Sequence, residues 1–170
     1  MNQLFQTKNL AIIGMLIALD IIFTRFLAIQ TAQIRISLGF FAIAIIGMLY
    51  GPAIAGIAAG MSDISGWVIA PNAPFFPGFT LSAVITGVLF GYFLHKPRVT
   101  MLSYILSALG LTIICDMLLN TLWLSILQHV PFLSMLFTRT IKIGVMAVLY
   151  ITVLPLVCEK IRSLLRARLI

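Results

Sequence analysis

The sequence predicts an all-α integral membrane protein with six transmembrane helices, which form a single domain over residues 1–170. Of the 170 residues, 62% are hydrophobic and only 9% are charged. The mean hydropathy of +1.17 is typical of membrane proteins rather than soluble domains. Apolar stretches also recur between prolines, glycines and charged residues. Because a hydrocarbon core about 30 Å thick needs about 20 apolar residues per helix, five or six spans account for nearly the whole chain.

We expect the helices at 8–28, 37–50, 52–68, 79–95, 99–128 and 133–165. Hydrocarbon favours helices in these apolar segments because unpaired backbone groups are costly there. The first segment is interpreted as a retained helix rather than a signal peptide, since Asp20 and Arg25 interrupt it and no convincing cleavage site follows. The short second and third helices are joined at Gly51 and Pro52, where glycine suits a bend and proline suits the first turn of a helix.

The loop at residues 70–78, before the fourth helix, contains three prolines and two adjacent phenylalanines. Prolines stiffen a connection, and paired aromatic side chains are unusual in a connector that only has to be soluble. This composition indicates a lid or wall over an outward-facing pocket. A loop that packs on its own bundle is the alternative.

The net charge of +7 does not indicate a nucleic-acid partner, because most of the basic residues flank helix ends. Seven of them, accompanied only by Glu159, are Lys8, Lys96, Arg98, Lys160, Arg162, Arg166 and Arg168. An excess of Lys and Arg marks cytoplasmic loops. Since an even number of spans puts both ends on one side, we expect a multi-pass protein with both termini in the cytoplasm.

The remaining charged residues belong to the membrane or to its opposite face. They are Asp20, Arg25, Arg35, Asp63, Asp116, Arg139 and Lys142. Interfacial snorkelling explains a single cation near a helix end. Four cations together, however, attract an anion.

One stripe of the fifth helix carries Asp116, Asn120 and Trp123. An ionisable side chain at membrane depth costs roughly 2.5–3.5 kcal/mol on insertion scales, so such residues tend to face a protein interior or a cavity. The favoured interpretation is a ligand site. A hydrogen-bonded clasp between helices is the alternative.

The third helix carries Gly56, Gly60, Asp63 and Trp67 at the spacing i, i+4, i+7 and i+11, which places them on one face. The glycines allow close packing on the inner half of the helix, and Asp63 and Trp67 line a gap on the outer half. If the third and fifth helices are neighbours, two acids and two indoles converge at similar depth.

The first helix presents Ala11, Gly14 and Ala18 along one line, with Asp20 on the opposite side. Small residues at this spacing leave a smooth strip that another helix can approach closely. Internal packing and the docking of a partner explain the strip equally well.

Motifs for catalysis are missing from the sequence. There is no Walker A, Gly-x-Ser-x-Gly, His-Glu-x-x-His or CxxC pattern, so we expect no ATP binding in the P-loop manner. Cys115 and Cys158 share no spacing that suggests a metal or a redox pair. We therefore expect a non-catalytic protein without a metal or a cofactor.

Three stretches resemble the substrate-binding subunits of energy-coupling-factor transporters, specifically the folate-type members. They are Phe76-Pro77-Gly78-Phe79-Thr80-Leu81-Ser82-Ala83, Arg35-Ile36-Ser37-Leu38-Gly39-Phe40 and Tyr50-Gly51-Pro52. The resemblance extends over nearly the whole chain, and Gly14 stands where the family usually has the first alanine of an Ala-x-x-x-Ala motif.

The resemblance implies a vitamin-binding subunit of the bacterial cell membrane. Such a subunit docks through its first helix, here through Ala11, Gly14 and Ala18, on a transmembrane coupling subunit driven by two cytoplasmic ATPase subunits. Folate also fits the residues themselves, because it has a flat pterin with a donor-rich edge and a glutamate tail with two carboxylates.

We therefore expect folate to be bound from outside by aromatic, polar and cationic side chains. The ring contacts are Trp67, Trp123, Phe76 and Phe79, the hydrogen-bond partners are Asp63, Asp116 and Asn120, and the carboxylate contacts are Arg25 and Arg139. One alternative is another vitamin, such as pantothenate or a thiamine precursor. Two others are an enzyme acting on lipid head groups with Asp63 and Asp116 as metal ligands, and a purely structural assembly subunit.

Overall fold

A computed structural model describes residues 7–30, 35–71, 74–96 and 99–167 of the chain. Its elements are α1 (Thr7–Ile21) with a π-helical end η1 (Ile22–Phe26), β1 (Ile29–Gln30), β2 (Arg35–Ile36), α2 (Phe40–Tyr50), α3 (Pro52–Ile69), α4 (Pro77–Leu94), α5 (Met101–Gly110), η2 (Leu111–Leu119), α6 (Asn120–Gln128) and α7 (Phe132–Ala167). Since α5, η2 and α6 follow each other without a break, the described chain forms six helical rods. The predicted all-helical membrane fold is thus confirmed.

Five of the rods are long and apolar enough to cross a membrane, whereas α2 is a shorter apolar helix. An 11-residue helix is only about 16 Å long at 1.5 Å per residue, roughly half of a hydrocarbon core. The prediction of a second helix from residue 37 was therefore too long. A two-stranded antiparallel hairpin, which pairs Ile29 with Ile36 and Gln30 with Arg35, precedes α2 instead.

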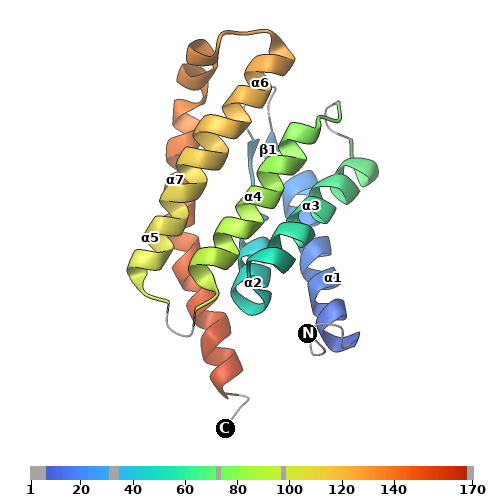
Figure 1. Ribbon diagram of the computed structural model, residues 1–170, viewed down its shortest axis with the longest axis vertical. Helices are drawn as coiled ribbons and strands as arrows, with labels where there is room; N and C mark the ends of the chain where they lie inside the picture. Colours follow the sequence, from blue (N-terminus) through green and yellow to red (C-terminus); the bar gives the residue numbers. More distant parts are fainter. Residues whose placement is uncertain (1–6, 31–34, 72–73, 97–98, 168–170) are drawn as a thin grey trace.

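The rods lie roughly along one another, with α1 and α3 on one side of the bundle and α7 with the α5–α6 rod on the other (Figure 1). The N-terminal end of α1 and the C-terminal end of α7 lie at the same end of the bundle, as predicted for a chain of six helices. The connections from α3 to α4 and from α6 to α7 lie at the opposite end.

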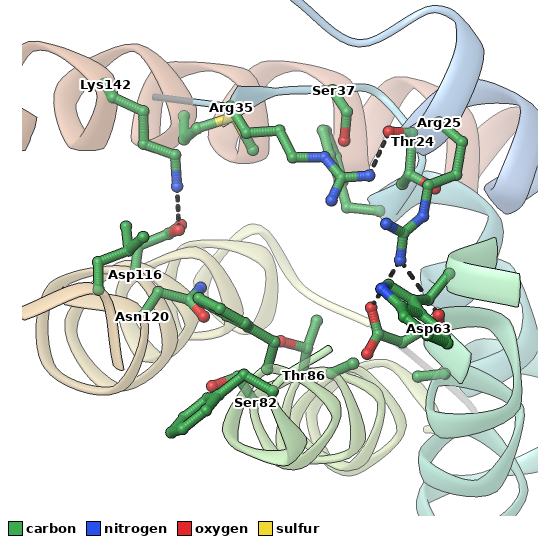
Figure 2. Close-up of a pocket in the computed structure, with 18 of the residues that line it drawn as sticks. Thr24, Arg25, Arg35, Ser37, Asp63, Ser82, Thr86, Asp116, Asn120 and Lys142 are labelled. Atoms are coloured by element: carbon green, nitrogen blue, oxygen red, sulfur yellow. Dashed lines mark hydrogen bonds and ion pairs between the residues drawn. The ribbon is translucent and has the colours of Figure 1, made fainter. Parts of the chain in front are cut away.

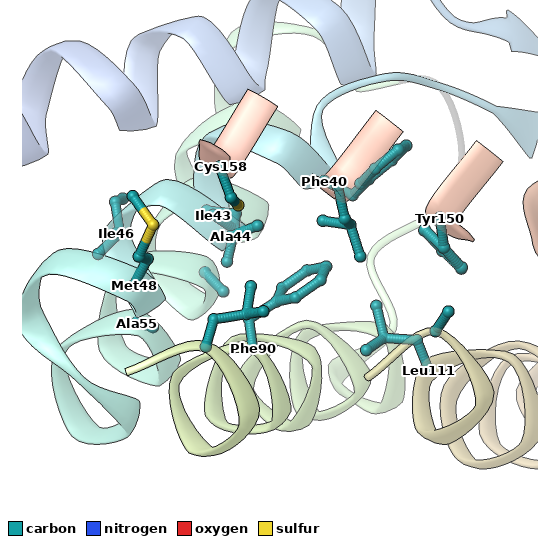
Figure 3. Packing of buried hydrophobic residues seen from close by; sticks show 14 of the residues in the cluster. Phe40, Ile43, Ala44, Ile46, Met48, Ala55, Phe90, Leu111, Tyr150 and Cys158 are labelled. Carbon is teal, nitrogen blue, oxygen red and sulfur yellow. The ribbon is translucent and has the colours of Figure 1, made fainter. Parts of the chain in front are cut away.

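The hydrophobic core lies between α2, α4 and α7, with contributions from α3, α5 and η2 (Figure 3). Phe90, Leu94 and Leu111 are fully buried there. Phe40 meets Tyr150 edge to face, with ring centroids 4.8 Å apart. This arrangement is typical of aromatic pairs and fixes the start of α2 against the middle of α7.

Helices α3 and α4 approach each other backbone to backbone at two glycines of α4. A Cβ atom added at Gly87 would lie 2.2 Å from the carbonyl oxygen of Ala55, and one added at Gly91 would lie 2.3 Å from Cα of Pro52. Small residues at i and i+4 permit such close contacts between membrane helices. On the facing side, Gly56 and Gly60 of α3 also pack against α4, as the glycine strip predicted.

Gly87→Val is expected to lower the free energy of unfolding by about 3 kcal/mol or more, because the obstructing atoms are backbone and cannot rotate away. Thermal unfolding of the purified protein in detergent measures the effect. Gly144→Val is the matched control, since a Cβ added at Gly144 meets nothing within 4 Å. Equal stability of the two variants would show that α3 and α4 do not meet at Gly87.

Candidate functional site

A cavity of about 560 Å³ lies among the helices (Figure 2). Its wall includes residues at the end of α3, the start of α4 and the end of α6, which lie at the end of the bundle away from the chain ends (Figure 1). Each of the six helical rods contributes to its wall, together with β2 and the residues just before α4. Cavities of about 300–1,000 Å³ are typical of sites for small molecules and cofactors. The residues 70–78, predicted to form a lid or wall, contribute Pro74, Phe75 and Phe76, while residues 72 and 73 lie outside the described part of the chain.

All seven charged residues that the sequence left in the membrane or at its opposite face line this cavity. They are Asp20, Arg25, Arg35, Asp63, Asp116, Arg139 and Lys142. Four of them are cationic and three are acidic, so the wall carries one positive charge in excess. The cost of a charge in hydrocarbon explains why such residues gather at one internal site.

One group of charges lies where the end of α1 meets α3. The Nη2 atom of Arg25 donates to Oδ1 and to the backbone carbonyl of Asp63, both at 3.1 Å. The second carboxylate oxygen of Asp63 accepts a hydrogen bond of 2.8 Å from Thr80. Arg25 therefore ties α1 to α3, and Asp63 is already bound on both oxygens.

Arg35 and Asp20 complete this group. Arg35 of β2 donates to the carbonyl of Thr24, and Ser62 donates to the buried carboxylate of Asp20. Burial lowers the pKa of Arg35 to about 10, with Arg25 adding to the effect and the two acids opposing it. Since this pKa is still well above neutral, Arg35 carries its charge at physiological pH.

A second group joins the α5–α6 rod to α7. Lys142 binds Oδ1 of Asp116, and the hydroxyl of Tyr150 donates to Oδ2 of the same carboxylate at 3.1 Å. The side chains of Lys142 and Asp116 are only 6% and 5% exposed. Figure 2 shows this pair on the opposite side of the cavity from the pair of Arg25 and Asp63.

Arg139 lies next to this second ion pair. Its Nη1 atom donates to the hydroxyl of Thr121 at 3.0 Å, and that hydroxyl donates in turn to the carbonyl of Asp116. Asp116 lies in the π-helical segment η2, which ends at Leu119. The hydroxyl of Thr121 binds the carbonyl of Asp116, which precedes it by five residues.

Aromatic side chains cover the cavity on the side of α3 and α4. Trp67 packs against Phe75 with ring centroids 5.2 Å apart, and Phe76 lies 5.9 Å from Phe79. Trp123 is not among the residues that line the cavity. It lies behind Phe76, at 5.6 Å between centroids, and its indole N–H donates to Ser82 at 3.0 Å.

The structure thus brings most of the predicted site residues to one cavity. Asn120 lines it as well, while Trp123 only supports the wall. Arg35, Lys142 and Tyr150 line the cavity although they were not among the predicted contacts. The sequence could have indicated Lys142 as a cavity residue, because Lys142 follows Arg139 by about one helical turn and therefore lies on the same face of the helix.

The predicted strip on α1 lies on the outside of the protein. Ala11, Gly14 and Ala18 are exposed, whereas Asp20 is buried. A Cβ atom added at Gly14 would meet nothing within 4 Å. At Gly14 the strip therefore packs against none of the described residues, which leaves it accessible to another helix.

Comparison with known proteins identifies the family. Residues 8–158 match the family model described as ECF transporter, substrate-specific component. A folate transporter FolT of Clostridium novyi (strain NT) is 40% identical over 131 residues, which are 77% of this chain and 76% of that protein. A folate transporter FolT of Leuconostoc mesenteroides is 29% identical over 142 residues, covering 80% of this chain and 76% of its own.

A solved structure agrees with these matches. The crystal structure of FolT bound with folic acid has a TM-score of 0.80 and 36% sequence identity to this chain, and covers 86% of this chain and 89% of its own. The similarity therefore extends over most of the fold described above. The chain belongs to the family of substrate-specific components of ECF transporters.

Proposed function

We propose that this chain is the high-affinity folate-binding subunit of an ECF-type vitamin importer. It captures folate outside the cell and delivers it by docking on a transmembrane coupling subunit, which two separate ATPase subunits power. The observation that carries the proposal is the cavity, where aromatic rings and cationic side chains meet within a wall to which all six helical rods contribute. The relatives named as folate transporters, and the one bound with folic acid, support the choice of ligand.

The chemistry of the wall suits folate. Its flat pterin stacks on aromatic side chains such as Trp67, Phe76 and Phe79, and its two carboxylates are balanced by cationic groups. Asn120 supplies an amide that can form a hydrogen bond with the ligand. Asp63 and Asp116 hold Arg25 and Lys142 in place, so they shape the site in addition to any hydrogen bond that they offer to the ligand.

The cavity faces the outside of a bacterial cell in this proposal. The basic residues Lys8 and Lys160 lie toward the chain ends, which are at the end of the bundle away from the cavity residues at the end of α3, the start of α4 and the end of α6. Because Lys and Arg favour the cytoplasmic side, this arrangement supports an orientation with both termini in the cytoplasm. The docking strip of Ala11, Gly14 and Ala18 then faces the coupling subunit within the membrane.

The alternatives fit the wall less well. A cationic thiamine precursor meets four cationic side chains, and pantothenate has no ring for the aromatic residues. An enzyme that uses Asp63 and Asp116 as metal ligands needs both carboxylates for the metal, but each binds a cationic side chain of the protein. A structural assembly subunit has no use for a cavity of about 560 Å³.

Trp67→Ala is expected to weaken folate binding by about 5- to 100-fold, because stacking of a heteroaromatic ring on an aromatic side chain contributes about 1–3 kcal/mol. Asp63→Ala is expected to weaken folate binding as well, since Arg25 loses the carboxylate that it binds. Calorimetric titration of the purified protein with folate measures both effects. Tyr92→Ala is the control, because Tyr92 is 66% exposed on α4 and does not line the cavity. Unchanged affinity in both variants would remove α3 from the site.

A further inference from the structure

The two sides of the cavity differ in their balance of charge. Where α1 meets α3, the cations Arg25 and Arg35 face two acids, Asp20 and Asp63. On the side of α7, Arg139 and Lys142 share a single acid, Asp116. The excess positive charge of the wall therefore lies on the side of α7.

Arg139 is the source of this excess. Its partner is the neutral hydroxyl of Thr121, whereas Lys142 binds the carboxylate of Asp116 directly. Arg139 is only 3% exposed, and its buried Nε atom has no hydrogen-bond partner among the described residues. Leaving a buried donor of a charged group without a partner costs free energy, so this guanidinium is not fully satisfied by the described residues. Arg139 also lines the cavity, so its guanidinium can bind an acceptor that is held there.

The geometry of a guanidinium suits a carboxylate as the acceptor. Its N–H groups form a planar fork that binds a carboxylate through two parallel hydrogen bonds. The bond to Thr121 uses Nη1 and holds the fork in place. Arg25 does not offer the same site, because its Nη2 atom is already bound to the carboxylate and the carbonyl of Asp63.

We propose that Arg139, positioned by Thr121, binds a carboxylate of the ligand's tail and makes the site selective for ligands with an anionic tail. The ligand then lies across the cavity, with its tail at α7 and its ring against Trp67 and Phe76 on the side of α3 and α4. This inference rests on the proposed function. It assigns Arg25 to the contact between α1 and α3 rather than to the ligand.

The test compares folate with folate dimethyl ester, which keeps the rings and the length but lacks both charges of the tail. The purified wild-type protein is expected to bind folate about 10- to 100-fold more tightly than the ester, since a bidentate bond between charged groups is strong. Arg139→Gln is expected to lose most of this preference by weakening folate alone. Since both affinities come from the same preparation, their ratio does not depend on how much of the variant is folded.

Arg25→Gln is the matched control. It is expected to weaken folate and the ester by the same factor, because it acts through the contact of α1 with α3. If Arg139→Gln does not fold, Thr121→Val tests the same point, since it removes only the hydroxyl that positions Arg139. A reduced preference for folate over the ester is expected there too.

Two results would overturn the inference. One is an equal affinity of the wild-type protein for folate and its ester. The other is a full preference for folate that persists in Arg139→Gln or, if that variant does not fold, in Thr121→Val. Both leave folate binding by this chain intact, whereas no binding of folate to the wild-type protein would overturn the proposed function itself.

Discussion

Asp116→Ala is expected to be the most damaging substitution in the chain. It leaves Lys142 charged, only 6% exposed and without its carboxylate partner, and it removes the acceptor of the Tyr150 hydroxyl. Breaking a buried ion pair by removing one partner costs about 3–5 kcal/mol, because the charge that remains is not compensated. For a protein of marginal stability this is a large part of the free energy of unfolding.

The double variant Asp116→Ala with Lys142→Met separates the lost charge partner from other effects of the substitution. Removing both charges is expected to restore much of the stability, since an apolar replacement of a buried pair is often neutral or better. Thermal unfolding in detergent and the yield of monodisperse protein measure both variants. If the single and double variants are equally unstable, the ion pair does not hold the α5–α6 rod against α7.

Gly14→Trp is expected to abolish folate uptake by cells while leaving folate binding to the purified subunit unchanged. The substitution places a large ring on the docking strip of Ala11, Gly14 and Ala18, where small residues allow another helix to approach. Gly14 is exposed, and a Cβ added there meets no atom of the described residues within 4 Å. The fold and the cavity are therefore untouched.

Uptake of labelled folate by cells that carry the complete transporter measures the first effect, and titration of the isolated subunit measures the second. Gly144→Trp is the matched control, since it adds the same ring at an equally open glycine of α7. It is expected to leave uptake unchanged. Normal uptake by the Gly14 variant would show that α1 does not dock through this strip.

The residues of the cavity were largely predictable from one physical constraint. The seven charged residues that the sequence assigned to the membrane or to the face opposite the predicted cytoplasmic one all line the cavity. A charge in hydrocarbon is costly, so each of them needs an internal site, and a small bundle offers few such sites. The sequence therefore indicates which charged residues belong to the site, although it does not show which of them form ion pairs.

Pairing and orientation depend on distances that helical periodicity does not supply. Asp116 and Asn120 line the cavity, but Trp123 of the same stripe turns toward Phe76 and Ser82. The π-helical η2 shifts the register within this rod, so a stripe drawn at 100° per residue does not stay on one face. The hairpin before α2 was also missed, although polar and apolar residues alternate over 33–36.

Glycine spacing gives a further example. Gly87 and Gly91 have the same small-x-x-x-small spacing as Gly14 and Ala18, yet the first pair is buried against α3 and the second is exposed. The motif says only that a helix can approach closely. Whether the approaching helix belongs to the same chain is decided by the arrangement of the bundle.

Titration of the purified wild-type protein with folate, followed by tryptophan fluorescence, tests the central claim most directly. Trp67 lines the cavity and Trp123 contacts Phe76 of its wall, so a pterin bound there lies close to both indoles. Saturable quenching with one folate per chain is expected, and excess pantothenate or thiamine is not expected to reverse it. Fluorescence that does not change saturably with folate, or quenching that either competitor reverses at similar concentration, would contradict the proposed function.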